Sequence, residues 1–296
     1  MSDSYWTPRQ PQANTRGRQL SATMDTKTIV LVTGANSGIG LASIRSFWES
    51  PKTYHILAAG RTLQKIQDAV APIRDSPSPG HSTIDEIEID ISDDVSITNA
   101  ASLIQGKFGR LDTLVNNAGG GNDTDYQNGT MSQREAWNRT MDLNVTSPQV
   151  MTTEFAPLLL KSADPRLLYI TSGMSSLQEE HTRTTPGEAR APKYPAGWPK
   201  AERTAATNAY AYRVSKTALN MMFLHWVRLF EADGVKCFAL SPGFLATNLA
   251  GDPELMKKAG AGDPSLGGDF IRDCVEGKRD EHAGRVIRRD GSIQDW

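Results

Sequence analysis

Short apolar runs rich in β-branched residues alternate along the chain with longer segments of helical periodicity. The runs, which predict strands, lie at 28–33, 54–59, 82–89, 111–116, 166–171 and 235–240, with a weaker one at 284–287. The helical segments lie at about 39–50, 61–76, 93–107, 131–162 and 207–232. This alternation predicts right-handed βαβ units. Because the run from Ile29 to Val32 is apolar at every position, it is typical of a strand covered on both faces. The predicted fold is α/β, a doubly wound parallel sheet of about seven strands with helices on both faces.

Three segments fall outside this alternation. Residues 1–26 are polar and contain Pro8 and Pro11, which predicts a flexible N-terminal tail. The remainder, 27–296, is expected to form one domain. Within it, 173–206 holds four prolines and reads as an insertion, whereas the glycine-rich 243–281 reads as a lid over the substrate. A disordered linker is the alternative interpretation of 243–281, and a plain surface loop that of 173–206.

Composition narrows the class of partner. The 32 Lys and Arg against 34 Asp and Glu give a formal charge of −2, which removes the electrostatic case for nucleic-acid binding. Cys237 and Cys274 are too few for a disulfide framework, which favours a reducing, cytoplasmic compartment. No run approaches the roughly 18 apolar residues of a membrane helix, and the five histidines lack metal-ligand spacing. We therefore expect a cytoplasmic protein with a small-molecule partner and without a nucleic-acid, membrane or metal partner.

The first predicted strand leads straight into a glycine-rich turn and then a helix. The turn reads Thr33-Gly34-Ala35-Asn36-Ser37-Gly38-Ile39-Gly40. Such a turn lets the backbone approach a pyrophosphate and presents it to the free N–H groups of the helix N-terminus. The glycine spacing is not GxGxxG, and taken alone a purely structural turn remains an alternative.

Arg61 follows the second predicted strand, where an acidic residue would bind the ribose 2′-hydroxyl of NAD. A guanidinium there can form charge-assisted hydrogen bonds to the 2′-phosphate of NADP. The sequence thus favours NADP(H), the alternative being an Arg61 that only caps the next helix or faces solvent.

Tyr212 and Lys216 lie four residues apart in a predicted helix, and therefore on one face of it. A nearby ammonium lowers the pKa of a phenol, which would make Tyr212 an acid-base catalyst near neutral pH. Taken alone, an isolated YxxxK is more often an ordinary exposed pair on a helix, so the other motifs of the chain decide the interpretation.

The motifs together resemble those of the classical short-chain dehydrogenase/reductase family, in particular NADP-preferring carbonyl-reductase-like members. TGxxxGxG follows the first strand, Asn116-Asn117-Ala118-Gly119 follows the fourth, and YxxxK comes late, so the resemblance covers about 27–290. It implies a Rossmann-type sheet. The C-terminal segment is similar to fungal members, which implies a setting in secondary metabolism.

The resemblance implies roles for individual residues. The catalytic positions are Asn144, Ser172, Tyr212 and Lys216. The cofactor-binding positions, besides Tyr212 and Lys216, are Gly34, Asn36, Ser37, Gly38, Ile39, Gly40, Arg61, Asp90, Ile91, Asn117, Ala118, Gly119, Pro242, Gly243, Leu245 and Thr247.

The implied reaction is hydride transfer between NADP(H) and a carbonyl or secondary alcohol of a medium-sized apolar substrate. Tyr212 would act as general acid/base, Ser172 would hold the substrate oxygen, and Lys216 would lower the phenol pKa and bind the nicotinamide ribose. Asn144 would hold a water that links Lys216 to solvent. The alternatives are a dehydratase or epimerase of the same family and an NADP(H)-binding regulatory protein.

One departure from the family pattern is the separation of Ser172 and Tyr212, which are 40 residues apart. Similar insertions occur in the carbonyl-reductase branch, where they cover the dimerisation face. The expected state is therefore a monomer or a homodimer. Alternatively the insertion lines the substrate pocket through Leu177, Tyr194 or Trp198.

Overall fold

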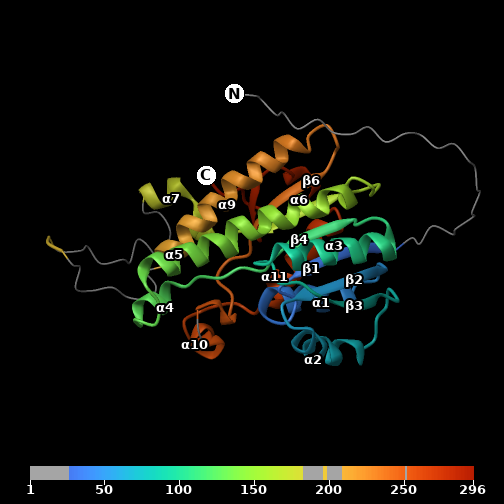
Figure 1. Ribbon diagram of the computed structural model, residues 1–296, viewed down its shortest axis with the longest axis horizontal. Coiled ribbons are helices and arrows are strands. Elements are labelled where there is room, and N and C mark those ends of the chain that lie inside the picture. Colours follow the sequence, from blue (N-terminus) through green and yellow to red (C-terminus); the bar gives the residue numbers. More distant parts are fainter. Residues whose placement is uncertain (1–26, 183–195, 199–208, 251) are drawn as a thin grey trace, which may run out of the picture.

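A parallel β-sheet runs through the centre of the molecule (Figure 1). The structure, a computed structural model, describes residues 27–182, 196–198, 209–250 and 252–296. The predicted tail and most of the predicted insertion, including Tyr194, lie outside the described residues. The strands are β1 (Thr28–Thr33), β2 (Tyr54–Gly60), β3 (Thr83–Glu88), β4 (Thr113–Asn116), β5 (Arg166–Ile170), β6 (Lys236–Ser241) and β7 (Val286–Arg288). They form one seven-stranded sheet in the order β3-β2-β1-β4-β5-β6-β7, which confirms the predicted fold.

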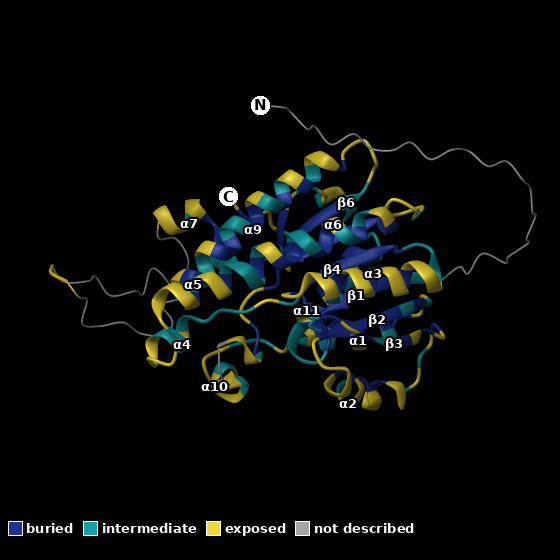
Figure 2. Cartoon of the chain, viewed as in Figure 1, coloured by how far each residue is buried: buried dark blue, intermediate teal, exposed yellow. Residues whose placement is uncertain are grey.

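Helices cover both faces of this sheet. One face is covered by α1 (Gly38–Trp48), α2 (Leu63–Arg74) and α11 (Ser265–Val275). The other is covered by α3 (Asp94–Phe108), α6 (Ser147–Leu159) and α9 (Tyr210–Leu229). Figure 2 shows the strands buried and the outward faces of the helices exposed. This is the doubly wound arrangement.

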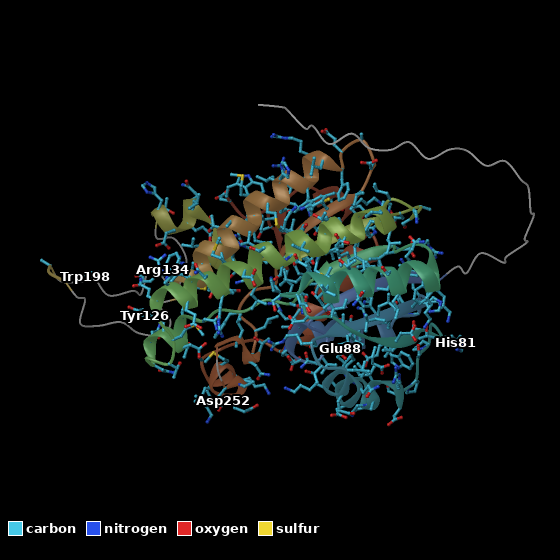
Figure 3. The ribbon with its side chains drawn as sticks, viewed as in Figure 1. His81, Glu88, Tyr126, Arg134, Trp198 and Asp252 are labelled. Carbon is cyan, nitrogen blue, oxygen red and sulfur yellow. The ribbon has the colours of Figure 1, made fainter. Side chains whose placement is uncertain are left out.

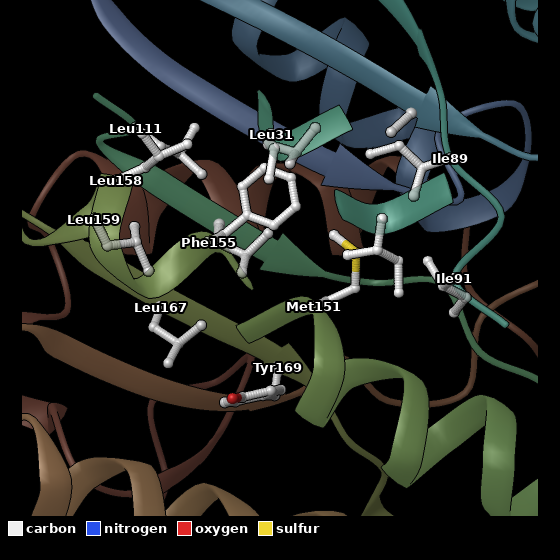
Figure 4. Close-up of a cluster of buried hydrophobic side chains, with 14 of the residues drawn as sticks. Leu31, Ile89, Ile91, Leu111, Met151, Phe155, Leu158, Leu159, Leu167 and Tyr169 are labelled. Carbon is white, nitrogen blue, oxygen red and sulfur yellow. The ribbon is translucent and has the colours of Figure 1, made fainter. Parts of the chain in front are cut away.

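Successive side chains of a strand point to opposite faces, so each central strand feeds two cores. Ile29 and Leu31 of β1 pack with α3, α6 and α9, whereas Val30 and Val32 pack with α1, α2 and α11. Figure 4 shows the first core, with Phe155 of α6 next to Leu31. The uninterrupted apolar run in β1 follows from this burial on both sides.

The strand order reverses at β1, whose neighbours are β2 and β4. In an open α/β sheet, ligands bind beyond the carboxyl ends of the strands at such a reversal. The predicted glycine-rich turn follows β1, and Asn117 follows β4. The fold therefore brings these two motifs together at the reversal, where doubly wound sheets form their ligand crevice.

The segment predicted as one helix over 131–162 is two helices with a π-helical turn between them. α5 spans Gln133–Met141, the π turn Asp142–Thr146, and α6 begins at Ser147. A π turn widens the helix locally and is frequent at functional sites. Here it contains Asn144. A short helix, α4 (Asp123–Gln127), precedes this pair.

The glycine-rich segment 243–281 is only partly what a lid would be. Its first half holds a 3₁₀ turn (Asn248–Ala250) and α10 (Pro253–Lys258) on the outside of the fold. Its second half contains α11, whose Phe270, Ile271 and Cys274 are buried against α1. A Cβ on Gly268 would lie 2.5 Å from the backbone carbonyl of Ala42, so this glycine permits a close helix contact. The predicted lid range therefore has to be shortened, because α11 is part of the core.

The smaller described elements are 3₁₀ turns at Gly173–Ser175 and Asp280–His282 and the helix α7 (Leu177–Thr182). None of the helices in the described part of the chain is long and apolar enough to cross a membrane.

Candidate active site

The glycine-rich turn has the backbone geometry of an anion cradle. Gly34 and Gly38 have φ of +66° and +53°, values that side-chain-bearing residues rarely adopt. A Cβ on Gly40 would lie 2.2 Å from the Gly34 carbonyl oxygen, so only glycine at this position lets the first turn of α1 pack on the end of β1. Ser37 precedes α1 in an extended conformation and its side chain caps no N–H group. The first-turn N–H groups of α1 are thus left for an anion.

The segment after β4 is bound directly to the end of β1. Thr33 Oγ1 accepts hydrogen bonds from the backbone N–H groups of Asn117 and Ala118, both at 3.0 Å. Asn117 Nδ2 donates to the Thr33 carbonyl oxygen at 2.8 Å. Asn117 and Ala118 therefore fix the wall of the crevice opposite the glycine-rich turn.

Asn144 connects this wall to the helix that carries Tyr212. Its amide bonds both backbone groups of Gly120, with Nδ2 to the carbonyl oxygen at 2.6 Å and the N–H to Oδ1 at 3.0 Å. Asn144 Nδ2 also donates to Ser215 Oγ at 2.9 Å. A Cβ on Gly119 would lie 2.7 Å from Asn144 Oδ1 and 3.3 Å from Lys216 Nζ, so Gly119 leaves room for both side chains.

Lys216 is buried and is anchored to the sheet. Its Nζ donates to the carbonyl oxygen of Ile170 at 2.8 Å and lies 5.7 Å from the centroid of the Tyr212 ring. Burial disfavours the ammonium and lowers the pKa of Lys216 to about 8. This value places its charge change close to neutral pH.

Tyr212 and Ser172 lie close together although 40 residues separate them. Desolvation raises the pKa of Tyr212 to about 12, against a smaller lowering by the Ser172 hydroxyl. The lowered phenol pKa expected from the sequence is therefore wrong. The Lys216 ammonium is directed to Ile170, and burial of the phenol dominates. The phenol therefore keeps its proton at neutral pH.

A buried hydrogen-bond network, which the sequence did not predict, holds the turn of Ser172. Ser175 Oγ donates to the Ser172 carbonyl oxygen at 2.6 Å and accepts from Asn220 Nδ2 of α9 at 2.8 Å. Gln294 lies 122 residues after Ser172 in the sequence, and its Nε2 donates to the same carbonyl oxygen at 3.1 Å. The weak apolar run at 284–287 predicts a strand nearby, but no pattern in the sequence marks Gln294.

Three of the expected cofactor-binding positions, Arg61, Asp90 and Ile91, lie along the carboxyl edge of β2 and β3. Arg61 is exposed directly after β2 and interacts electrostatically with Asp90. Burial raises the pKa of Asp90, but hydrogen bonds from the Ser92 hydroxyl and N–H outweigh it and hold the carboxyl ionised. Ile91 is buried in the core, so its side chain supports this edge from inside.

The segment after β6 closes over the glycine-rich turn. Pro242 is buried, Gly243 is exposed with φ of +87°, and Leu245 pairs with Gly262 through a β-bridge. A Cβ on Gly38 would lie 3.3 Å from Thr247 Cγ2, which places Thr247 next to the cradle. The structure thus brings this segment and the cradle to one edge of the sheet.

The expected pocket lining from the insertion finds no support in the described part of it. Leu177 is 64% exposed on α7 and Trp198 is 78% exposed. Figure 3 shows Trp198 far from the body of the molecule. Within the described ranges, no three His, Cys, Asp or Glu side chains are grouped so that they could hold a metal ion.

Comparisons with known proteins agree with this architecture. Residues 28–183 match the family described as short chain dehydrogenase. The chain is 42% identical to the short-chain dehydrogenase/reductase eupG of Phoma sp, over 91% of this chain and 98% of the relative. It is also 42% identical to the short-chain dehydrogenase/reductase tropE of Talaromyces stipitatus, over 90% and 97%. The chain therefore belongs to the short-chain dehydrogenase/reductase family of oxidoreductases.

Solved structures show the same fold at low sequence identity. An NADPH-bound carbonyl reductase from chicken fatty liver superimposes with a TM-score of 0.71 at 21% identity, covering 91% of this chain and 99% of that one. The carbonyl reductase Sniffer of D. melanogaster gives a TM-score of 0.70 at 21% identity, with 91% and 99% covered.

Proposed function

We propose that this protein is a cytoplasmic NADPH-dependent oxidoreductase that reduces a carbonyl group of a medium-sized apolar compound to a secondary alcohol. The observation that carries this proposal is the convergence of Ser172, Tyr212 and Lys216 at one end of α9, beside the crevice. Structures of the same fold hold NADPH, 5-hydroxy-NADP or NADH, which supports a nicotinamide cofactor, and the exposed Arg61 favours NADPH among these.

The residues around the crevice fit a dinucleotide. The positive-φ glycines and the first-turn N–H groups of α1 suit a pyrophosphate, and exposed Arg61 suits a 2′-phosphate. Gly119 leaves the Lys216 ammonium next to the crevice, within reach of ribose hydroxyls. When bound, the reduced nicotinamide supplies the hydride.

The chain itself supplies proton transfer and orientation. Ser172 and Tyr212 present two hydroxyl groups to one substrate oxygen, and Tyr212 donates its proton to that oxygen as negative charge develops. Lys216 holds positive charge 5.7 Å from the phenol ring and stabilises the phenolate that remains. Asn144 keeps Gly120 and Ser215, and thereby both walls of the site, in register.

The proposal is tested by the loss of NADPH absorbance in the presence of a panel of aldehydes, ketones and quinones. We expect oxidation that depends on the carbonyl compound. Conversion of a substrate without net consumption of NADPH would instead identify a dehydratase or epimerase. Tight NADPH binding with no conversion of any panel member would favour a regulatory binding protein.

A further inference from the structure

The helix that carries Tyr212 begins without a capping side chain of its own. α9 starts at Tyr210, and the residue at its N-cap position, Ala209, makes no side-chain cap hydrogen bond. Alanine has no oxygen that could accept one, and an uncapped start leaves first-turn N–H groups unsatisfied. A group from elsewhere in the fold must therefore bind them.

That group is the carboxylate of Asp123, 88 residues earlier in the chain. The Ala211 N–H donates to Asp123 Oδ1 at 2.9 Å, and the Tyr212 N–H donates to Oδ2 at 3.1 Å. Figure 1 shows α4, which begins with Asp123, beside the start of α9, in agreement with their contacts. A carboxylate at a helix N-terminus is favoured by the helix dipole. Asp123 thus caps α9 and binds the backbone of Tyr212 itself.

The loop that presents Asp123 is itself held in place. The Asn122 N–H donates to Thr140 Oγ1 of α5 at 3.0 Å, and Gly120 is bound by Asn144. A Cβ on Gly121 would lie 3.2 Å from the Cβ of Tyr212, so the loop packs directly on that side chain. Because its loop is held in this way, Asp123 fixes the position of the Tyr212 backbone.

We propose that Asp123 is a positioning residue, which sets the place of the Tyr212 phenol relative to Ser172 by holding the first turn of α9. This inference rests on the proposed function, since its effect is on the proposed proton transfer. Lys216 lies one turn further along α9 and has its own anchor at Ile170. Loss of Asp123 should therefore displace Tyr212 more than Lys216. A displacement of about 1 Å can lower a rate by up to about 100-fold.

The test compares Asp123→Ala with Asp93→Ala, a matched loss of an aspartate cap. Asp93 caps α3 through the Val95 N–H at 3.0 Å. For Asp123→Ala we expect kcat to fall at least about 10-fold, NADPH Kd to change less than about 3-fold, and the amides of Ala211 and Tyr212 to exchange faster. For Asp93→Ala we expect a lower Tm with kcat unchanged. Asp123→Asn, which keeps the size and one acceptor oxygen, should give an intermediate kcat and guards against a misfolded alanine variant.

The outcomes separate this inference from the proposed function. Faster exchange at Ala211 and Tyr212 with kcat retained would reduce Asp123 to an ordinary cap and overturn the positioning role. Unchanged exchange at these two amides would overturn it as well, whatever the turnover. If the wild-type protein oxidises NADPH with none of the carbonyl compounds tested, the proposed function is overturned. The exchange rates of the Ala211 and Tyr212 amides would still show whether Asp123 holds the first turn of α9.

Discussion

The ammonium of Lys216 donates a 2.8 Å hydrogen bond to the carbonyl oxygen of Ile170, two residues before Ser172. This contact joins the second turn of α9 to the carboxyl end of β5. It fixes the distance between the strand that supplies Ser172 and the helix that supplies Tyr212. This hydrogen bond is buried. Because burial also lowers the pKa of Lys216, the free energy of unfolding should depend on pH.

Burial lowers the pKa of Lys216 to about 8, whereas an unfolded lysine titrates near about 10.4. Between these values the unfolded chain binds one proton more than the folded chain, so this residue makes stability rise with pH, by about 1.4 kcal/mol per unit. We expect the free energy of unfolding of wild type relative to Lys216→Met to rise at about that slope from pH 8 to 10. Below pH 7 the difference should be constant. Urea unfolding across this range measures it, and a difference independent of pH up to 10 contradicts the lowered pKa.

Arg61 should give the protein a higher affinity for NADPH than for NADH. A hydrogen bond from a charged group contributes about 1.5–3 kcal/mol, so Arg61→Ala should weaken NADPH binding by about 10- to 100-fold. NADH binding should change less than about 3-fold, because NADH lacks the 2′-phosphate. Exposed Lys65→Ala, on the adjoining helix α2, controls for the general loss of a positive charge. Fluorescence titration with both cofactors measures this, and equal losses for the two would remove Arg61 from the account.

Gly268 should tolerate no side chain. Its Cβ would lie 2.5 Å from the backbone of Ala42, and overpacking of a core commonly destabilises by about 1–3 kcal/mol. Gly106→Ala is the control, since Gly106 lies in α3 with nothing within 4 Å of its Cβ. That variant should be neutral or more stable by up to about 1 kcal/mol. Denaturant unfolding of both variants tests whether α11 is core, and full stability of Gly268→Ala would restore the lid interpretation of this segment.

Replacing Gln294 by glutamate should make the stability of the protein depend on pH. Its side chain is 1% exposed, and its Nε2 donates to the Ser172 carbonyl oxygen and to Ser175 Oγ, both at 3.1 Å. Gln294→Glu places a carboxyl against these acceptors, so burial raises the pKa of the new group above its unfolded value. Its carboxylate is then disfavoured in the folded state, and the variant should lose about 2 kcal/mol relative to wild type between pH 5 and 7. Exposed Gln178→Glu should lose little, and a pH-independent difference for Gln294→Glu would contradict the contact.

Much of the fold could be predicted because apolar runs mark buried strands. β1 was expected at 28–33 and lies at Thr28–Thr33. The break at Asn144 could not be predicted, because the π turn depends on hydrogen bonds with Gly120 and Ser215 from distant parts of the chain. Gly268 misled for a related reason, since glycine is used for close helix packing as well as for flexible loops.

The candidate site likewise contains residues that local sequence patterns predict and residues that they do not. Tyr212 and Lys216 could be recognised from local spacing, and the structure places Tyr212 next to Ser172 and the Lys216 ammonium 5.7 Å from the centroid of the Tyr212 ring. Asp123 and Gln294 act on backbone groups 88 and 122 residues away, and no local pattern marks such contacts. The direction of the Tyr212 pKa shift also escaped prediction, because it depends on how deeply the phenol is buried.

The central claim is that a hydride passes from NADPH to a carbonyl carbon while Tyr212 protonates the oxygen. The most direct test is a single turnover with NADPH that carries deuterium at both hydrogen positions of nicotinamide C4, using a carbonyl compound that the panel identifies, in wild type and Tyr212→Phe. We predict an alcohol that carries one deuterium on the former carbonyl carbon. In Tyr212→Phe the rate should fall at least about 100-fold with NADPH affinity within about 3-fold of wild type. An alcohol without deuterium, or an undiminished rate in Tyr212→Phe, would contradict the account.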